Sequence, residues 1–269
     1  MPSAAQITKS WFFIVLLIYG GSVAIALSPV GEVILRLCEN CREPLTQEER
    51  EYLLPLFEEV YENAKEIDPK LNHDIQLYIM DGVYVNAFAI GRKTIAVTRG
   101  AIATFTADEL KGILAHELGH MTHGHTKALL LSVVGNFFFS IIVWMFRLLL
   151  YFLEVISNIV AHFNIVGVIF WLLTVATRFM ADLSIFLFIE LSQIILALNS
   201  RSNEIQADTY AYEVGYGVEL ISGLYVLQKI SMNTNVKLSE KMKASHPHTA
   251  YRIAHLEKLE NEDIPELEE

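Results

Sequence analysis

The feature that most limits what this chain can fold into is a long apolar stretch, residues 128–199, set between two charged and polar parts. Its most apolar segments are Ala128–Phe146, Asn164–Thr177 and Ala181–Leu198. A helix needs about 20 apolar residues to cross the core of a bilayer, so hydropathy allows two or three crossings here. The third segment contains Asp182 and Glu190. Because carboxylates are costly in lipid, we expect this segment to be buried in protein or to stand partly outside the bilayer.

A shorter apolar run, Trp11–Leu27, lies near the start of the chain and is just long enough to span a bilayer. The alternative is a secretory signal peptide with Ala24-Ile25-Ala26 as its cleavage site. We favour an uncleaved anchor, because the later stretch already commits the chain to a membrane. The formal net charge of −11, with no basic stripe, argues against a nucleic-acid partner. Cys38 and Cys41 form a single C-x-x-C, which indicates a local disulfide or two free thiols rather than a structural zinc site.

A metal-binding motif, His116-Glu117-Leu118-Gly119-His120, precedes the apolar stretch. Thr106 and Glu109 form a capping-box pattern ahead of it, and apolar residues recur at helical spacing, so the motif is predicted to lie on a helix. Two histidines four positions apart share one helix face, and both imidazoles can then bind one Zn²⁺. Glu117 is placed to act as general base toward an attacking water. The alternative is a chance match whose histidines are buried or solvated.

Two further histidines, His123 and His125, follow the motif. The extended motif H-E-x-x-H-x-x-G-x-x-H needs a histidine at position 126, which is Thr126 here, and its glycine position holds His123. We therefore expect both histidines to support the metal site without binding the metal, or to be solvated. Direct ligation by His123, seven residues after His116 and near the same helix face, is the alternative.

The third metal ligand is expected beyond the apolar stretch. A catalytic zinc site takes three protein ligands and keeps one position open. Glu204 is the best candidate, and Asp208, one helical turn further on, can accept the free N–H of a zinc-bound histidine. By itself, a pair of carboxylates at this spacing is usually a solvated helix face. If Glu204 does complete the site, the apolar insert must cross the membrane an even number of times, and we expect two crossings.

Three short strands are predicted between an earlier helix and the metal-binding motif. The helix begins with the capping box of Thr46 and Glu49 and runs to about Tyr61. The strands are expected at Ile75–Met80, Tyr84–Ala89 and Thr94–Thr98, with turn signals at Asp81-Gly82 and Gly91-Arg92. The alternation in the first strand predicts one aliphatic face and one mixed face. A sheet edge beside a zinc site can hold an extended peptide by main-chain hydrogen bonds, whereas the alternative is a hairpin that only builds core.

A histidine in a proline-containing loop, Ser245-His246-Pro247-His248, follows the second half of the predicted site. Such a histidine can donate to a developing oxyanion near zinc, although by itself it would more often be an ordinary surface residue. The segment Glu260–Glu269 is acidic and contains Pro265, which predicts a disordered tail.

Several motifs, in order, make the chain similar to one family, the HtpX-type membrane zinc peptidases, in the gluzincin group that also contains the CAAX prenyl proteases. They are Asn86–Gly91, Asp108–Leu110 leading into His116–His120, Ser200–Asp208, and Ser245–Pro247 with Arg252. The resemblance implies that His116, His120 and Glu204 bind one zinc ion and that Glu117 is the catalytic base. It also implies that Asn86 and Ala87 lie on the substrate-binding edge strand, and that His246 and Arg252 assist at the tetrahedral intermediate.

One departure from the family bears on orientation. Members usually have two apolar spans before the catalytic domain, and this chain shows one. With Lys9 on the cytoplasmic side, the positive-inside rule would place the active site outside the cytoplasm. The family likeness favours a cytoplasmic active site in the inner or plasma membrane of the cell, and that is our expectation.

The sequence therefore predicts an α+β fold: a mainly helical, gluzincin-like zinc peptidase core with a small β-sheet, interrupted by a transmembrane helical insert. The expected parts are an N-terminal membrane anchor (1–31), the first part of the catalytic domain (32–127), the membrane insert (128–199), the second part of the catalytic domain (200–258) and an acidic tail (259–269). The predicted function is a membrane-embedded, zinc-dependent endopeptidase, and the resemblance implies a role in the quality control of misfolded or damaged membrane proteins. The alternatives are an inert membrane scaffold that keeps its zinc site, and a zinc hydrolase of a lipid or small amide.

Overall fold

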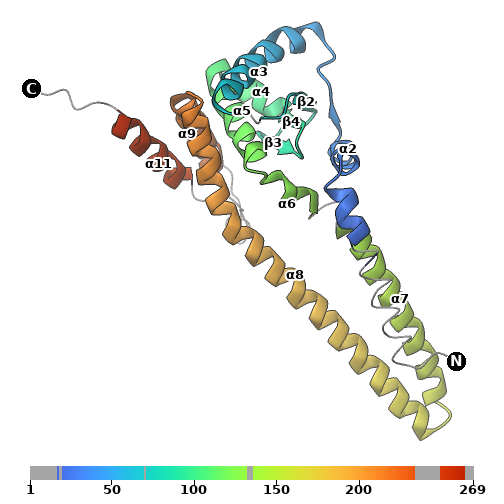
Figure 1. Ribbon diagram of the computed structural model, residues 1–269. Coiled ribbons are helices and arrows are strands. Elements are labelled where there is room, and N and C mark those ends of the chain that lie inside the picture. Colours follow the sequence, from blue (N-terminus) through green and yellow to red (C-terminus); the bar gives the residue numbers. More distant parts are fainter. Residues whose placement is uncertain (1–16, 18–19, 70, 132–135, 234–248, 264–269) are drawn as a thin grey trace, which may run out of the picture. The chain divides into compact units, whose positions relative to one another are not determined.

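The computed structural model describes residues 17, 20–69, 71–131, 136–233 and 249–263 (Figure 1). Contacts divide the chain into two compact units. One consists of Met1–Ile25 with Val133–Leu196, and the other of Ala26–Ser132 with Ala197–Glu269. The second unit contains a small sheet among helices, so the predicted α+β class is confirmed. The five-part division of the chain stays a prediction.

The sheet of the second unit has four strands in the order β1-β2-β4-β3. The strands are β1 (Cys41–Arg42), β2 (Gln76–Met80), β3 (Ala87–Ile90) and β4 (Thr94–Thr98). β2 and β4 are parallel, and β3 and β4 form an antiparallel hairpin. The last three strands are near their predicted places, although β3 starts three residues later than expected. The two-residue β1 was not predicted, because so short a strand has no alternation to detect.

Both faces of the central strands are buried, so the mixed face predicted for the first strand is covered as well as the aliphatic one. Four consecutive residues of β2, Leu77–Met80, are buried, as are all five residues of β4. The long helix α3 (Gln47–Ile67) starts at the predicted capping box but continues six residues beyond Tyr61. Four other helices of the unit are α4 (Arg99–Thr104), α6 (Thr126–Leu130), α9 (Gly217–Asn233) and α11 (Thr249–Asp263). Because α11 extends to Asp263, the predicted disorder is wrong for residues 260–263.

The helix that bears the metal-binding motif, α5 (Ala107–Thr122), forms the centre of the core. It packs against α3, α9 and β3 (Figure 1). The predicted capping box of Thr106 and Glu109 is present at its start. Buried residues occur all round the helix rather than on one stripe, which is the pattern of a helix inside a core. A Cβ atom at Gly112 would lie 2.4 Å from the backbone nitrogen of Leu220, so glycine is required for the close packing of α5 on α9.

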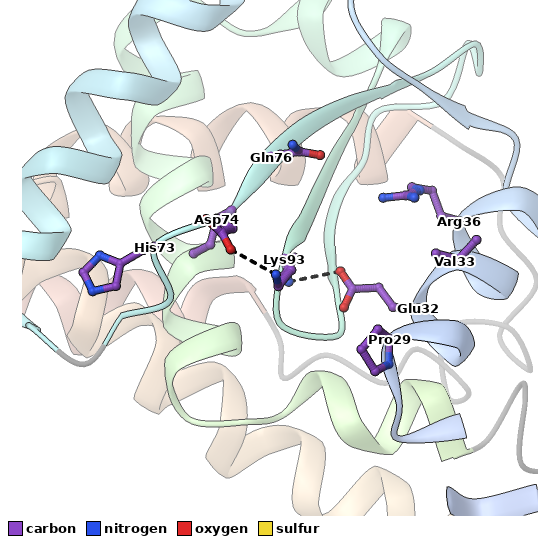
Figure 2. Close-up of a pocket in the computed structure, with 9 residues that line it drawn as sticks. Pro29, Glu32, Val33, Arg36, His73, Asp74, Gln76 and Lys93 are labelled. Atoms are coloured by element: carbon purple, nitrogen blue, oxygen red, sulfur yellow. Dashed lines mark hydrogen bonds and ion pairs between the residues drawn. The ribbon is translucent and has the colours of Figure 1, made fainter. Parts of the chain in front are cut away.

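The second unit begins with α2 (Pro29–Cys38), which is tied to the sheet by a buried glutamate. Glu32 accepts hydrogen bonds from the backbone N–H groups of Arg92 and Lys93 and from the hydroxyl of Thr94. A cavity of about 610 Å³ lies between α2 and the start of β2 (Figure 2). The Lys93 ammonium at its edge pairs with Asp74 at 3.1 Å. Glu32 thus holds the β3–β4 turn against α2, and Asp74 ties the Lys93 side chain to the segment before β2.

The other unit contains α7 (Asn136–Ala161) and the first part of α8 (Ile165–Glu213), whose residues from Ala197 onward belong to the second unit. Two of their segments, Val143–Ala161 and Ile165–Leu187, are long and apolar enough to cross a membrane. A third span arises if Gly20–Ala26 and Pro29–Cys38, bent by 73°, are counted as one. Two candidate spans in the insert match the predicted number of crossings. Most of the predicted N-terminal anchor lies outside the described residues.

The candidate spans carry more charge than the sequence suggested, because their positions differ from the expected ones. Arg147 pairs with Asp182 at 2.6 Å, and Arg178 pairs with Glu154. The hydroxyls of Ser157 and Thr174 lie 2.9 Å apart and are buried between the helices. Pairing lowers the cost of charged groups in a bilayer. The segment Ala181–Leu198 is not a separate helix but continues the second candidate span within α8.

Candidate metal centre

The candidate site is built where the last turns of α8 cross α5. Both helices have small residues at the crossing: a Cβ atom at Gly119 would lie 2.9 Å from the Cα of Ala207. Ala207 is completely buried. This close approach lets side chains from either helix reach a common point, and a larger residue at position 119 would separate the helices. The glycine within the H-E-L-G-H motif therefore has a packing reason.

The structure brings together the three predicted metal ligands. The Nε2 atoms of His116 and His120 are 3.1 Å apart. The carboxylate oxygens of Glu204 lie 3.5 Å from Nε2 of His116 and 3.4 Å from Nε2 of His120. Ligands bound at about 2.0–2.1 Å around a tetrahedral zinc ion lie about 3.3 Å from one another. Among the residues that the structure describes, these three form the one group with metal-binding spacing, and their donor set suits zinc.

His116 is held from behind by a buried carboxylate. Its Nδ1 lies 2.9 Å from Oδ1 of Asp208, which is fully buried. Burial, the largest effect, lowers the pKa of His116, as does the charge of Arg252, but the hydrogen bonds with Asp208 and Glu204 outweigh both and raise this pKa to about 9. Burial alone would raise the pKa of Asp208, yet its bonds with His116 and Arg252 hold that pKa below the ordinary value. The buried carboxylates thus favour a positive charge at His116.

His120 is held by a neutral and more open chain of contacts. Its Nδ1 lies 3.0 Å from Nδ1 of His125, and Nε2 of His125 lies 3.1 Å from the side-chain oxygen of Gln206. If the His120 Nδ1–H donates to His125, then His125 can donate its Nε2–H to Gln206, and His120 Nε2 faces the metal. His125 therefore takes the supporting role that the sequence allowed. The ring of His123 stacks on that of His125, with centroids 5.5 Å apart, and its Nδ1 lies 2.9 Å from the backbone carbonyl oxygen of Gly119.

The other predicted site residues have different positions. Glu117 is buried on α5 beside His116. Ala87 opens β3, and Asn86 directly precedes it on an exposed stretch; within the described residues, β3 pairs with β4 on one side and with no strand on the other. Arg252 lies on α11 and contacts both Asp208 and Glu204. His246 falls outside the described residues, so its role stays a prediction.

Two contacts of the site were not predicted. The hydrogen bond from His125 to Gln206 joins residues 81 positions apart, and Arg252 meets Glu204 from a helix that follows much later in the chain. No spacing rule connects such positions. Gln206 lies two residues from both Glu204 and Asp208, a spacing that gave no reason to place it at the same site.

The sequence model of peptidase family M48 matches residues 50–260. A protease HtpX homolog from Methylacidiphilum infernorum is 26% identical over 231 residues, which cover 84% of this chain and 71% of that protein. Protease HtpX from Pseudomonas putida strain F1 is 26% identical over 213 residues, covering 75% of this chain and 63% of that protein.

Other matches are shorter or concern the fold alone. A protease HtpX homolog from Helicobacter acinonychis is 41% identical over 64 residues, which are 22% of this chain and 21% of that protein. The matched regions thus span from about a fifth to 71% of these curated relatives. The crystal structure of Ste24p from S. mikatae matches with a TM-score of 0.50 and 21% identity, covering 91% of this chain and 57% of that one. This likeness supports the arrangement of helices and sheet.

Proposed function

Because this chain belongs to peptidase family M48, we propose that it is a membrane-embedded, zinc-dependent endopeptidase. The observation that carries the proposal is the triad of His116, His120 and Glu204, whose donor atoms have the spacing of tetrahedral zinc ligands. Two histidines and one carboxylate leave a fourth position open, which distinguishes a catalytic zinc site from a structural one. The two apolar helices of the insert indicate a membrane protein.

When bound, zinc lowers the pKa of a water molecule and polarises the scissile carbonyl. Glu117 takes the proton of the attacking water and passes it to the leaving amine. Asp208 fixes the proton of His116 on Nδ1, so that Nε2 keeps its lone pair for the metal. His125 does the same for His120. His246 donates to the oxyanion in this scheme, as the sequence suggested.

A peptide is the substrate that the sheet favours. Among the described residues, β3 pairs with no strand on the side away from β4, so an extended chain could pair with its backbone N–H and C=O groups there, and α5 packs against this strand. Asn86 and Ala87 lie where β3 begins, and Asn86 is exposed. Lipids and small amides have no repeating backbone to pair with such an edge. This difference favours endopeptidase activity over the hydrolysis of small molecules.

The cellular setting of the activity is also part of the proposal. We place the catalytic residues on the cytoplasmic side of the cell membrane, inner or plasma, where they cleave misfolded or damaged membrane proteins. The support is the family likeness together with the apolar hairpin in the insert. Cysteine accessibility at Cys38 in intact cells tests the side of the membrane.

The decisive test compares the wild type with Glu117→Gln in detergent, measuring both zinc content and cleavage of casein. We expect Glu117→Gln to keep one zinc ion per chain and to lose activity by roughly 10²–10⁴-fold, because a general base is removed while the ligands stay. Asp108→Asn, on the same helix but exposed, is the matched control and should keep both properties.

Two outcomes would overturn the proposal. Unchanged cleavage by zinc-loaded Glu117→Gln would show that this residue is not the base. A wild-type protein that binds zinc but cleaves neither casein nor itself would favour the inert scaffold instead.

A further inference from the structure

Arg252 holds the two carboxylates of the site at once. Its Nε and Nη2 atoms lie 2.8 and 2.6 Å from the two oxygens of Asp208, and its Nη1 lies 3.0 Å from Oε2 of Glu204. The three side chains are 9%, 0% and 3% exposed, so water has little access to these contacts. We propose that Arg252 is a positioning residue, which fixes the oxygen that Glu204 presents to the metal and the carboxylate that orients His116.

The contact with Glu204 distinguishes its two oxygens. Both lie near a histidine nitrogen, Oε2 at 3.5 Å from Nε2 of His116 and Oε1 at 3.4 Å from Nε2 of His120, but it is Oε2 that lies 3.0 Å from the Arg252 guanidinium. Because the guanidinium holds Oε2, the carboxylate presents Oε1 to the metal and is hindered from offering both oxygens. Coordination through one oxygen keeps the fourth position of a tetrahedral zinc ion open for water or substrate. Arg252 thus helps to keep the fourth coordination position available for water or substrate.

The contact with Asp208 extends the effect to a second ligand. The guanidinium and the carboxylate meet through two parallel hydrogen bonds, a geometry that fixes orientation as well as distance. The same Oδ1 atom of Asp208 that meets Arg252 lies 2.9 Å from Nδ1 of His116. A shift of Asp208 would therefore move the imidazole of His116. Two of the three metal ligands depend on one guanidinium.

This role differs from the one that the sequence suggested for Arg252, assistance at the tetrahedral intermediate. Three of its nitrogen atoms already contact carboxylates that are themselves buried. A group that binds substrate would alter KM, or the rate of the zinc-loaded enzyme, without altering zinc affinity. A group that positions the ligands must alter zinc affinity itself, and this difference is measurable.

The positive charge of Arg252 and its positioning contacts are expected to have opposite effects on zinc affinity, so a measurement of zinc affinity can distinguish them. The positive charge of Arg252 repels a cation, so its removal alone would tighten zinc binding. Loss of the positioning contacts would weaken it. Arg252→Lys keeps the charge but cannot form the two-pronged bond to Asp208 together with the contact to Glu204. Arg252→Gln removes the charge as well.

The inference rests on the proposed zinc function, and the experiment separates the two. The zinc dissociation constant is measured by chelator competition in detergent for the wild type, Arg252→Lys, Arg252→Gln and Lys258→Met, with KM and kcat for the zinc-loaded forms. Lys258 is an exposed cation on α11 and serves as control. A wild type without zinc affinity would refute the proposed function and the inference together.

We expect Arg252→Lys to weaken zinc binding by roughly 10–100-fold, with kcat lowered and KM little changed, while Lys258→Met behaves as wild type. Arg252→Gln should also bind zinc more weakly, although the loss of a positive charge alone would tighten zinc binding. This variant decides the question if Arg252→Lys does not fold. Unchanged affinity in Arg252→Lys, or tighter binding in Arg252→Gln, overturns the positioning role. Either result leaves the proposed peptidase function standing.

Discussion

The two histidines of the triad share a helix and a task but are supported in different ways. Behind His116 stands Asp208, a buried carboxylate that is itself bound by a guanidinium. Behind His120 stands His125, a partly buried neutral ring that leads to the amide of Gln206. The first support consists of charged groups away from water, and the second of neutral groups near it.

This difference indicates which side of the site is rigid. Hydrogen bonds between charged groups are about twice as strong as neutral ones, and a low dielectric strengthens them further. His116 is therefore expected to be a fixed ligand, whereas His120 is held more weakly by a partner that competes with water. Three substitutions test this contrast, two by removing a support and one by strengthening the weaker support.

The largest effect is expected from Asp208→Ala, which removes the carboxylate that supports His116. Arg252 would lose two of its contacts while it stays buried, and removing one partner of a buried ion pair costs about 3–5 kcal/mol of unfolding free energy. The variant should have a lower thermal unfolding midpoint and should bind zinc far more weakly than the wild type. Both are measured on the detergent-solubilised protein, with Asp208→Asn as a variant of nearly the same shape. A variant as stable as the wild type would contradict the account of the His116 side.

A smaller effect is expected from His125→Ala, which breaks the His120 side. Loss of a partner behind a metal-binding histidine typically costs 10–100-fold in metal affinity, and the weak support here places the effect at the lower end, about tenfold. Because no buried charge loses its partner, the unfolding midpoint should change little. His123→Ala is the comparison variant, because it removes a ring that stacks on His125 but leaves the contact between His125 and His120 in place. If His125→Ala lowers the unfolding midpoint as much as Asp208→Ala does, then the supports of His116 and His120 contribute equally to stability and the proposed contrast is wrong.

The parts of this site that the sequence predicted are those governed by short-range periodicity. The capping box of Thr106 and Glu109 and the four-residue spacings of His116 with His120 and of Glu204 with Asp208 are properties of single helices. The meeting of the two pairs followed from zinc's need for a third ligand, and the structure brings them together. These predictions needed only helix geometry and coordination chemistry.

The parts that were not predicted depend on how helices pack. The contact between Arg252 and Glu204 joins α11 to α8. The parallel pairing of β2 with β4 joins two strands that are separated in the sequence by β3. Hydropathy placed the first candidate span too early, because it avoided Arg147 and Glu154, whose partners lie on the facing helix. Hydropathy counts the free-energy cost of a charged residue in a membrane span, but it does not show the partner on another helix that offsets this cost.

The smallest effect is expected from strengthening the weaker side with His125→Asp. The Nδ1 atom of histidine and an oxygen of aspartate occupy similar positions relative to the backbone, so the new carboxylate can accept the same proton from His120. A charged acceptor raises the basicity of a metal-binding imidazole.

His125→Asp should therefore tighten zinc binding, by less than about tenfold because His125 lies partly in water. His125→Asn is the matched control, because it offers a neutral oxygen at the same place and should bind zinc much as the wild type does. Chelator competition compares the three proteins at one ionic strength. If His125→Asp binds zinc no more tightly than His125→Asn, then the charge of the supporting group does not explain why His116 is held more firmly than His120. Burial and the contacts of Arg252 must then explain it.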